Sequence, residues 1–220
     1  MQYKRHKPTL EEKLKLPGNN NVETLLLVIS ARLTEKVPVV LLGRASYEVD
    51  DPALSKNLIE ELKEKQKMHE TRNIHIITED IDGFATDATE IITAMAHRGS
   101  YVAELCDTYF HPLGNETLFL PEKWEERLED VKIKNCHNLE IKRLHPLDFI
   151  LCKGAAGRAK DEIFLKPCMK IKKISKEDIK KHWEKTNCQK LKKIIDHPST
   201  MECFKRTLGF KPTDPEININ

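Results

Sequence analysis

A short run of apolar residues, Val39-Val40-Leu41-Leu42, follows Pro38 and ends at Gly43. An all-apolar run of this length that stops at a glycine is typical of a strand buried on both faces. The run therefore predicts a sheet strand with little exposure to solvent.

The residues before this strand predict an amphipathic helix. Asn20 is a favoured N-terminal cap, and Glu23 stands three residues after it, as in a capping box. Apolar residues then recur at helical spacing, so one face of the helix is expected to pack in a core. These residues are Val22, Leu25, Leu26, Ile29 and Leu33.

Further elements follow along the chain. Asp51-Pro52 predicts a helix that runs to about residue 69, and Thr86 or Asp87 caps another that ends at Gly99. Short runs of apolar and β-branched residues predict more strands. The predicted strands are 74–78, 118–120, 131–133 and 139–141, and later helices are predicted at 163–169, 176–193 and 201–208.

Acidic residues gather at Glu79-Asp80-Ile81-Asp82, and a further acid, Glu140, stands between two apolar residues. In an extended segment, the spacing of Asp80 and Asp82 puts both on one face and turns Ile81 into the core. Crowded carboxylates repel unless a cation lies between them, and Mg²⁺ prefers oxygen ligands. The stretch therefore predicts either a magnesium site or a polar turn, and Glu140 is either a third carboxylate there or solvent-exposed.

The densest group of residues without an obvious folding role lies between 142 and 162. Pro146 begins a predicted helix with an apolar face. Beyond it, cations and carboxylates stand close together across a break made by Gly154 and Gly157, which suits a phosphate-handling site and a solvated helix junction equally well. These charged residues are Lys153, Arg158, Lys160, Asp161 and Glu162.

Composition excludes several classes of protein. The 220 residues, of which 39% are hydrophobic and 33% charged, suit one globular core with at most a small appendage. The longest apolar run, Leu25–Ile29, is far too short to span a membrane. No apolar signal region follows the basic N-terminus, so we expect a cytoplasmic protein. The six cysteines form no C-x-x-C pair, which argues against a zinc ribbon.

Charge is unevenly distributed along the chain. Residues 166–206 hold 13 Lys or Arg against 5 Asp or Glu, a net charge of +8 in a chain whose total is +2. This basic segment could bind an anionic polymer such as RNA, or it could be a lysine-rich helix face in contact with water.

Two segments of the second half resemble one family. They are Leu120-Pro121-Glu122-Lys123-Trp124-Glu125-Glu126-Arg127-Leu128, and Arg143 to Asp148 with Lys153, Gly157-Arg158 and Lys160-Asp161. Both are similar to segments of the minimal nucleotidyltransferases, relatives of the AbiEii-type toxin enzymes in the DNA polymerase beta-like superfamily. In the first half, Leu42-Gly43-Arg44-Ala45-Ser46 lies where the superfamily has a glycine turn, and Asp80-Ile81-Asp82 where it has Asp-x-Asp. Arg44 replaces a small residue of that turn.

The resemblance implies a set of site residues. Asp80, Asp82 and Glu140 would be catalytic and would hold one or two Mg²⁺ ions beside a nucleoside triphosphate (NTP). A glycine in the turn would let the backbone approach the triphosphate, a hydroxyl would donate to it, and cations would neutralise the leaving pyrophosphate. The implied nucleotide-binding residues are Gly43, Arg44, Ser46, Lys153 and Arg158.

The resemblance also implies the fold and the reaction. The fold is α+β: residues 1–150 form a small mixed β-sheet flanked by helices, 151–210 a helical C-terminal region, and 211–220 a flexible tail. The reaction moves a nucleoside monophosphate from an NTP to a hydroxyl on RNA, such as tRNA, or on protein. A cognate antitoxin is one expected partner, and a membrane is not. Two other hypotheses stay open: a catalytically inactive binding protein whose Arg44 fills the nucleotide slot, and an RNA-binding module.

Overall fold

The computed structural model describes residues 20–47, 49, 60, 80–85, 89–113, 119–186 and 198–212 of the chain. The chain divides into two compact units. The first comprises residues 1–55, 79–116 and 128–144, and the second comprises residues 56–78, 117–127 and 145–220. The second unit thus takes in two segments that precede residue 144. The predicted division into residues 1–150, 151–210 and 211–220 stays a prediction.

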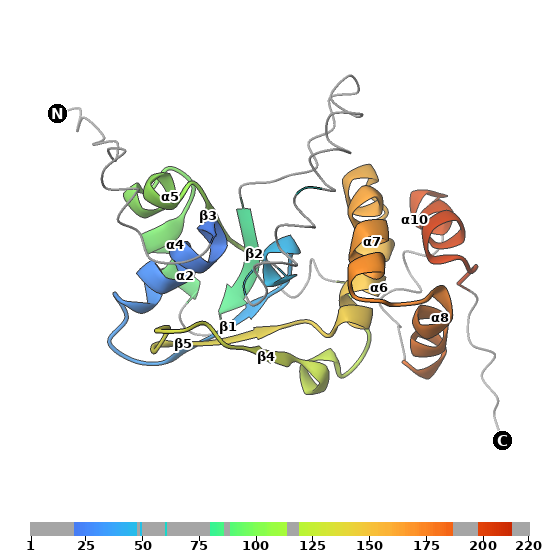
Figure 1. The fold of residues 1–220 in the computed structure, drawn as a ribbon, viewed down its shortest axis with the longest axis horizontal. Helices are drawn as coiled ribbons and strands as arrows, with labels where there is room; N and C mark the ends of the chain where they lie inside the picture. The colour runs from blue at the N-terminus through green and yellow to red at the C-terminus, as the bar shows by residue number, and fades with distance from the viewer. Residues whose placement is uncertain are drawn as a thin grey trace. The chain divides into compact units, whose positions relative to one another are not determined.

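The first unit contains a five-stranded mixed sheet with the strand order β3-β2-β1-β5-β4 (Figure 1). β1 runs antiparallel to β2 and parallel to β5, while β2 is parallel to β3 and β4 is antiparallel to β5. The mixed sheet with its helices confirms the predicted α+β fold. The strands are β1 (Val37–Leu41), β2 (Asp80–Ala85), β3 (Tyr109–Pro112), β4 (Glu129–Val131) and β5 (Leu139–Arg143).

Alternate residues of the strands form one face of the sheet that packs in the core. Leu41, Ile81 and Phe110 are each at most 1% exposed. The same hydrophobic cluster contains residues of α2 (Asn21–Ser30), α4 (Thr89–Ala96) and α5 (Tyr101–Cys106), which therefore cover this face. Burial of Ile81 is the orientation that the spacing of Asp80 and Asp82 predicts.

The other face of the sheet carries acidic and basic side chains around the buried Val40. Because directly paired residues point to the same side of a sheet, the register places five acidic or basic side chains on this face. We call it the polar face, and its described acidic and basic members are Asp82, His111, Asp130, Lys142 and Glu140. Their side chains are between 23% and 74% exposed.

The predicted cap of the first helix is confirmed. Asn20 has an extended backbone, and its side chain accepts a hydrogen bond of 2.8 Å from the backbone N–H of Glu23. The far end of this helix is tied to the sheet by Asn138, whose backbone N–H donates to Oγ of Ser30 and whose side chain donates to the carbonyl of Leu33. These bonds fix the start of β5 beside the start of β1.

Several elements differ from the sequence predictions. Asp80 and Asp82 lie within β2 itself and not after a strand, because Ile81 between them is buried as a strand residue. β3 and α5 were not predicted, and Phe119 and Leu120 do not form the predicted strand. The strand predicted at 74–78 and all but one residue of the helix predicted at 51–69 lie outside the described residues.

The second unit is helical in its described part. Its core contains Phe149, Ile179 and Phe204, all fully buried, and Trp183 contacts Phe204 edge to face with ring centroids 5.5 Å apart. Gly157 ends α6 with a φ of 58°, a conformation that favours glycine. The elements are η4 (Trp124–Arg127), α6 (Pro146–Ala156), α7 (Ala159–Ile171), α8 (Lys176–Lys185), α10 (Pro198–Cys203) and η5 (Phe204–Leu208).

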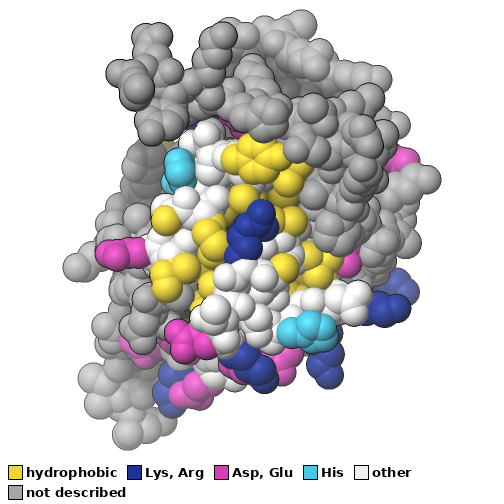
Figure 2. All heavy atoms as spheres, turned by 90° about the vertical axis from the view of Figure 1, so that its left-hand side faces the viewer, with side chains coloured by type: hydrophobic (Ala, Val, Ile, Leu, Met, Phe, Trp, Pro, Cys, Tyr) yellow, Lys and Arg dark blue, Asp and Glu magenta, His cyan; other side chains and the backbone are white. Residues whose placement is uncertain are grey.

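Few large hydrophobic side chains are highly exposed among the described residues. The exposed large ones are Ile91 on α4 and Tyr101 on α5. Figure 2 shows hydrophobic side chains gathered on one face of the molecule, with a basic side chain among them. None of the described helices has the length and apolar character needed to cross a membrane.

Candidate functional site

The turn after β1 is held against β2 at Gly43. The backbone N–H groups of Leu42 and Gly43 both donate to the carbonyl of Asp82, over 2.9 and 3.4 Å. A Cβ atom on Gly43 would lie 2.8 Å from Cβ and from Oδ2 of Asp82, closer than real Cβ contacts come. Only glycine therefore lets this turn approach the Asp82 carboxylate so closely.

Ser46 shapes the same turn from inside. It belongs to η1 (Arg44–Tyr47), is fully buried, and donates a hydrogen bond of 2.7 Å from its hydroxyl to the carbonyl of Gly43. Since a hydroxyl has one proton to donate, this bond takes up the donor that we predicted for the triphosphate. The described role of Ser46 is to fix the conformation of Gly43. The side chain of Arg44 lies outside the described residues.

Asp82 is paired with a histidine that the sequence analysis did not single out. His111 stands directly opposite Asp82 in the parallel β2–β3 register. Its Nδ1 atom lies 3.2 Å from Oδ1 of Asp82, and the two side chains are 50% and 23% exposed. A carboxylate and an imidazole thus meet on the polar face beside the Gly43 turn. Asp80 begins the same strand opposite Tyr109, and its side chain lies outside the described part of the chain.

Glu140 shares the polar face but lies far along it from Asp82. Glu140 pairs with Pro38 near the start of β1. Gly83 pairs with Leu41 at the end of β1, and Asp82 lies one residue beyond that pair. Four strand residues correspond to about 13 Å, and two strand spacings add about 9 Å across the sheet. The contact of Glu140 in the structure is with Lys36, at 3.9 Å between exposed groups. The register does not bring Glu140 beside Asp82, and its role as a metal ligand stays a prediction.

The two predicted phosphate-binding cations of the second unit share a buried acid. Asp161 is 4% exposed, and its carboxylate accepts a hydrogen bond of 3.1 Å from Nη2 of Arg158. Nζ of Lys153 lies 3.6 Å from the same carboxylate. Both cations therefore neutralise a charge of their own unit, at the junction of α6 and α7. Their contact with a nucleotide stays a prediction.

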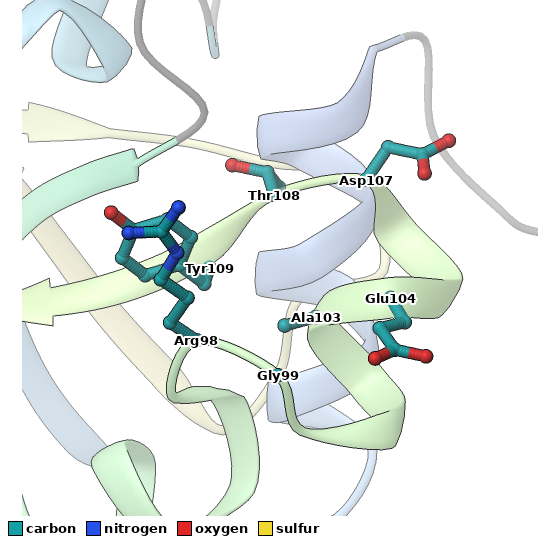
Figure 3. Close-up of a pocket in the computed structure, with 7 residues that line it drawn as sticks. All are labelled: Arg98, Gly99, Ala103, Glu104, Asp107, Thr108 and Tyr109. Atoms are coloured by element: carbon teal, nitrogen blue, oxygen red, sulfur yellow. The ribbon is translucent and has the colours of Figure 1, made fainter. Parts of the chain in front are cut away.

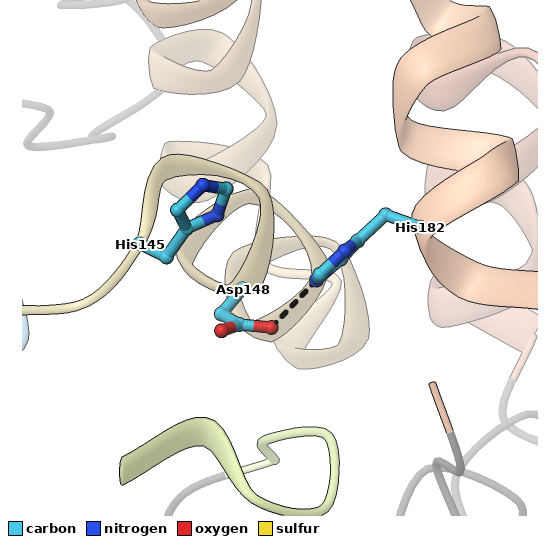
Figure 4. Close-up of side chains that lie close together, drawn as sticks. All are labelled: His145, Asp148 and His182. Carbon is cyan, nitrogen blue, oxygen red and sulfur yellow. Dashed lines mark hydrogen bonds and ion pairs between the residues drawn. The ribbon is translucent and has the colours of Figure 1, made fainter. Parts of the chain in front are cut away.

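A second carboxylate–histidine cluster lies in the helical unit (Figure 4). Asp148 on α6 is fully buried and receives two hydrogen bonds from Arg127, of 2.8 and 3.0 Å. His182 on α8 donates a third from Nε2, of 2.7 Å. His145 stands beside them, its ring centroid 5.8 Å from that of His182.

These contacts mark the Asp148 cluster as a structural clamp. His145, Asp148 and His182 each offer a ligand atom within 4.8 Å of the others, which is close enough for a metal ion. The guanidinium of Arg127, however, already occupies both oxygens of Asp148, and its positive charge would repel a cation placed there. Burial works to raise the pKa of Asp148, but the hydrogen bonds from His182 and Arg127 and the charge of Arg127 outweigh it and lower this pKa. The cluster joins η4, α6 and α8.

A small hollow lies at the start of β3 (Figure 3). Its volume is about 190 Å³, and it is lined by the turn at Arg98 and Gly99, by α5 and by Tyr109, over whose ring the Arg98 guanidinium lies at 5.9 Å. Pockets for drug-sized ligands usually measure about 300–1,000 Å³. The hollow is therefore too small to enclose a nucleoside triphosphate.

The polar face at Asp82 fits a divalent cation better than the other described clusters do. The carboxylate of Asp82 is partly exposed, and carboxylates are ligands that hard cations prefer. Among the described residues, the group that would pair with it as a cation is His111, when its imidazole is protonated. The glycine turn beside Asp82 provides close backbone approach. The sequence did not predict the contact of His111 with Asp82, because β3 was not predicted. It did not predict the hydrogen bond between Asp148 and His182 either, because the two residues lie far apart in the chain.

Residues 36–200 match a family described as "Nucleotidyltransferase of unknown function (DUF6036)". The chain belongs to this family. No curated protein and no solved structure is similar enough to the chain to count as a match.

Membership of the DUF6036 family confirms the predicted nucleotidyltransferase relationship, while the narrower likeness to AbiEii-type toxins stays a prediction. The matched range includes the Gly43 turn, β2 with Asp80 and Asp82, and the α6–α7 segment with Lys153 and Arg158.

Proposed function

We propose that this nucleotidyltransferase-family chain transfers a nucleoside monophosphate from an NTP to a hydroxyl group on RNA or protein. The observation that carries the proposal is the packing of the Gly43 turn against the Asp82 carboxylate on the polar face. In this arrangement, backbone that can come close to a phosphate lies beside a carboxylate that can bind a divalent cation. Family membership supports the same reaction class.

The reaction exchanges one phosphorus–oxygen bond for another. The acceptor hydroxyl oxygen forms a bond to the α-phosphorus, the bond from that phosphorus to the β-bridging oxygen breaks, and pyrophosphate leaves. The hydroxyl proton passes to water. A divalent ion such as Mg²⁺ supplies charge neutralisation at the α-phosphate and lowers the pKa of the attacking hydroxyl.

The residues of the chain act by position and charge. Asp82, together with Asp80 as predicted, would hold the cation. Gly43 would leave room for the triphosphate, and Ser46 would keep the turn in shape through its bond to the Gly43 carbonyl. Preorganised groups of this kind stabilise a transition state because they need no rearrangement as charge develops.

The test is label transfer from each of the four α-³²P-labelled NTPs, with Mg²⁺ or Mn²⁺ and bulk tRNA, followed by denaturing gels of RNA and protein. Asp82→Asn should lower transfer at least about a hundredfold, as loss of a transition-state stabilising group does. Asp130→Asn is the matched control, because Asp130 is an acid on β4 whose side chain is 74% exposed. Its nearest described cation, Nζ of Lys142, lies 3.9 Å away.

A second measurement does not depend on the acceptor. An NTP at 100 times its dissociation constant should raise the free energy of unfolding by about 2.7 kcal/mol, and only when a divalent ion is present. Absence of stabilisation by all four NTPs would favour an inactive binding protein. Salt-dependent RNA binding that survives Asp80→Asn with Asp82→Asn would instead favour an RNA-binding module.

A further inference from the structure

We propose that His111 is a ligand of the divalent ion at Asp82 and that this makes the site prefer a transition metal such as Mn²⁺ over Mg²⁺. The inference rests on the proposed function, since it concerns the same ion. It assigns a residue on β3 that lies outside the Asp-x-Asp stretch, and it names the class of metal that the site would take.

The distance between the two side chains suits ligation of one ion. Nδ1 of His111 and Oδ1 of Asp82 are 3.2 Å apart. Two neighbouring ligands at right angles around an ion, each about 2.1 Å from it, are about 3.0 Å apart. An ion could therefore replace the hydrogen bond between these atoms with little movement of either strand.

The strand pairing makes this geometry stable without the ion. Asp82 and His111 are direct partners in the parallel β2–β3 register, so their Cβ atoms start from neighbouring positions on the same face. Behind them, Ile81 and Phe110 are paired in the same register and are at most 1% exposed. The two ligands thus stand on strands anchored in the core, which is the support that a metal site needs.

The register does not place the predicted third carboxylate ligand, Glu140, beside Asp82. Glu140 pairs with Pro38 at the far end of β1 and contacts Lys36. His111 is partly exposed and stands directly beside Asp82, and neutral imidazole is a common metal ligand. Nitrogen ligation disfavours Mg²⁺, which prefers oxygen, more than it disfavours first-row transition metals, of which Mn²⁺ is the weakest binder.

The experiment measures binding of Mn²⁺ and Mg²⁺ alone to the full chain, Mn²⁺ by electron paramagnetic resonance and Mg²⁺ by its competition with Mn²⁺. Because loss of a residue that only supports a ligand already costs about tenfold in metal affinity, His111→Ala should weaken Mn²⁺ binding at least about tenfold. It should change Mg²⁺ binding much less, so that the preference for Mn²⁺ falls. His137→Ala is the matched control, because His137 is another exposed histidine of the first unit.

The outcomes separate this inference from the proposed function. Loss of Mn²⁺ binding in Asp82→Asn together with unchanged binding in His111→Ala would overturn the role of His111 and leave the carboxylate site standing. Unchanged Mn²⁺ binding in both variants would mean that Asp82 and His111 do not form an ion site. Thermal unfolding of each variant shows that it is folded, and His111→Gln, which cannot present the same nitrogen, should behave like His111→Ala.

Discussion

Among the described residues, two pairs of aspartate and histidine have very different surroundings. Asp82 and His111 meet on the polar face of the sheet, where both side chains keep contact with water. Asp148 is fully buried in the helical unit, where Arg127 and His182 give it three hydrogen bonds. The first carboxylate can still accept a ligand, whereas the second has its charge and its lone pairs satisfied by the protein. The same two residue types thus form a candidate site in one unit and a structural clamp in the other.

The largest expected effect on stability is from Asp148→Ala. It leaves the guanidinium of Arg127 facing the interior without its carboxylate, which should lower the free energy of unfolding by about 3 kcal/mol. Asp82→Ala removes a partly exposed pair and should cost less than about 1 kcal/mol. Urea unfolding of both variants measures the difference, and equal losses would mean that the two regions are not distinct in kind.

The histidines give a smaller version of the same contrast. His182→Ala removes a hydrogen bond to a buried carboxylate and should cost about 2 kcal/mol. His111→Ala changes a half-exposed side chain and should stay within about 0.5 kcal/mol of the wild type. Thermal or urea unfolding tests the pair, and a larger loss for His111 would show that the sheet depends on it structurally.

Gly43→Ala tests the close packing of the turn after β1 against Asp82. The added Cβ would press on Cβ and Oδ2 of Asp82, so stability should fall by about 1–2 kcal/mol and binding of Mn²⁺ should weaken with it. Gly154→Ala is the matched change in the other unit, where the new Cβ would meet Cδ1 of Leu208. It should lower stability and leave Mn²⁺ binding unchanged, and a loss of binding in Gly154→Ala would contradict this division of roles.

The smallest expected effect is on the free energy of unfolding at low pH. Because hydrogen bonds and charge hold the pKa of Asp148 below its ordinary value of 3.8, the folded state favours its ionised form. This contribution is fully present above pH 3.8 and is lost as the pH falls through the lower pKa of the folded state. The difference in unfolding free energy between the wild type and Asp148→Asn should therefore shrink as the pH falls below 3.8. A difference that stays constant down to pH 2 would rule out the ionised clamp.

Local patterns in the sequence predicted a good part of the fold. The cap at Asn20 and the buried run at Val39–Leu42 depend on neighbouring residues, and both are present in the structure. β3 was missed because Tyr109–Pro112 is short, carries a histidine and ends in proline. Its existence depends on pairing with β2, which no local pattern reveals.

The candidate site was predictable only in part. Asp82 and Gly43 were found from their places in motifs, and the structure brings them into contact. His111 was not found, because it reaches Asp82 through a strand pairing with no sequence signal of its own. The placing of Glu140 depends on register, and a shift of a few residues along a strand moves a side chain by more than the size of a metal site.

The order of strands also has a consequence for how the chain is made. β1 stands in the middle of the sheet, yet one of its two neighbours, β5, begins about a hundred residues later, with Val37 paired to Leu139. At about 5–20 residues per second, a ribosome needs roughly 5–20 s to supply that partner. During this interval one edge of this apolar strand has no partner strand in the nascent chain, and unpaired apolar strand edges favour aggregation.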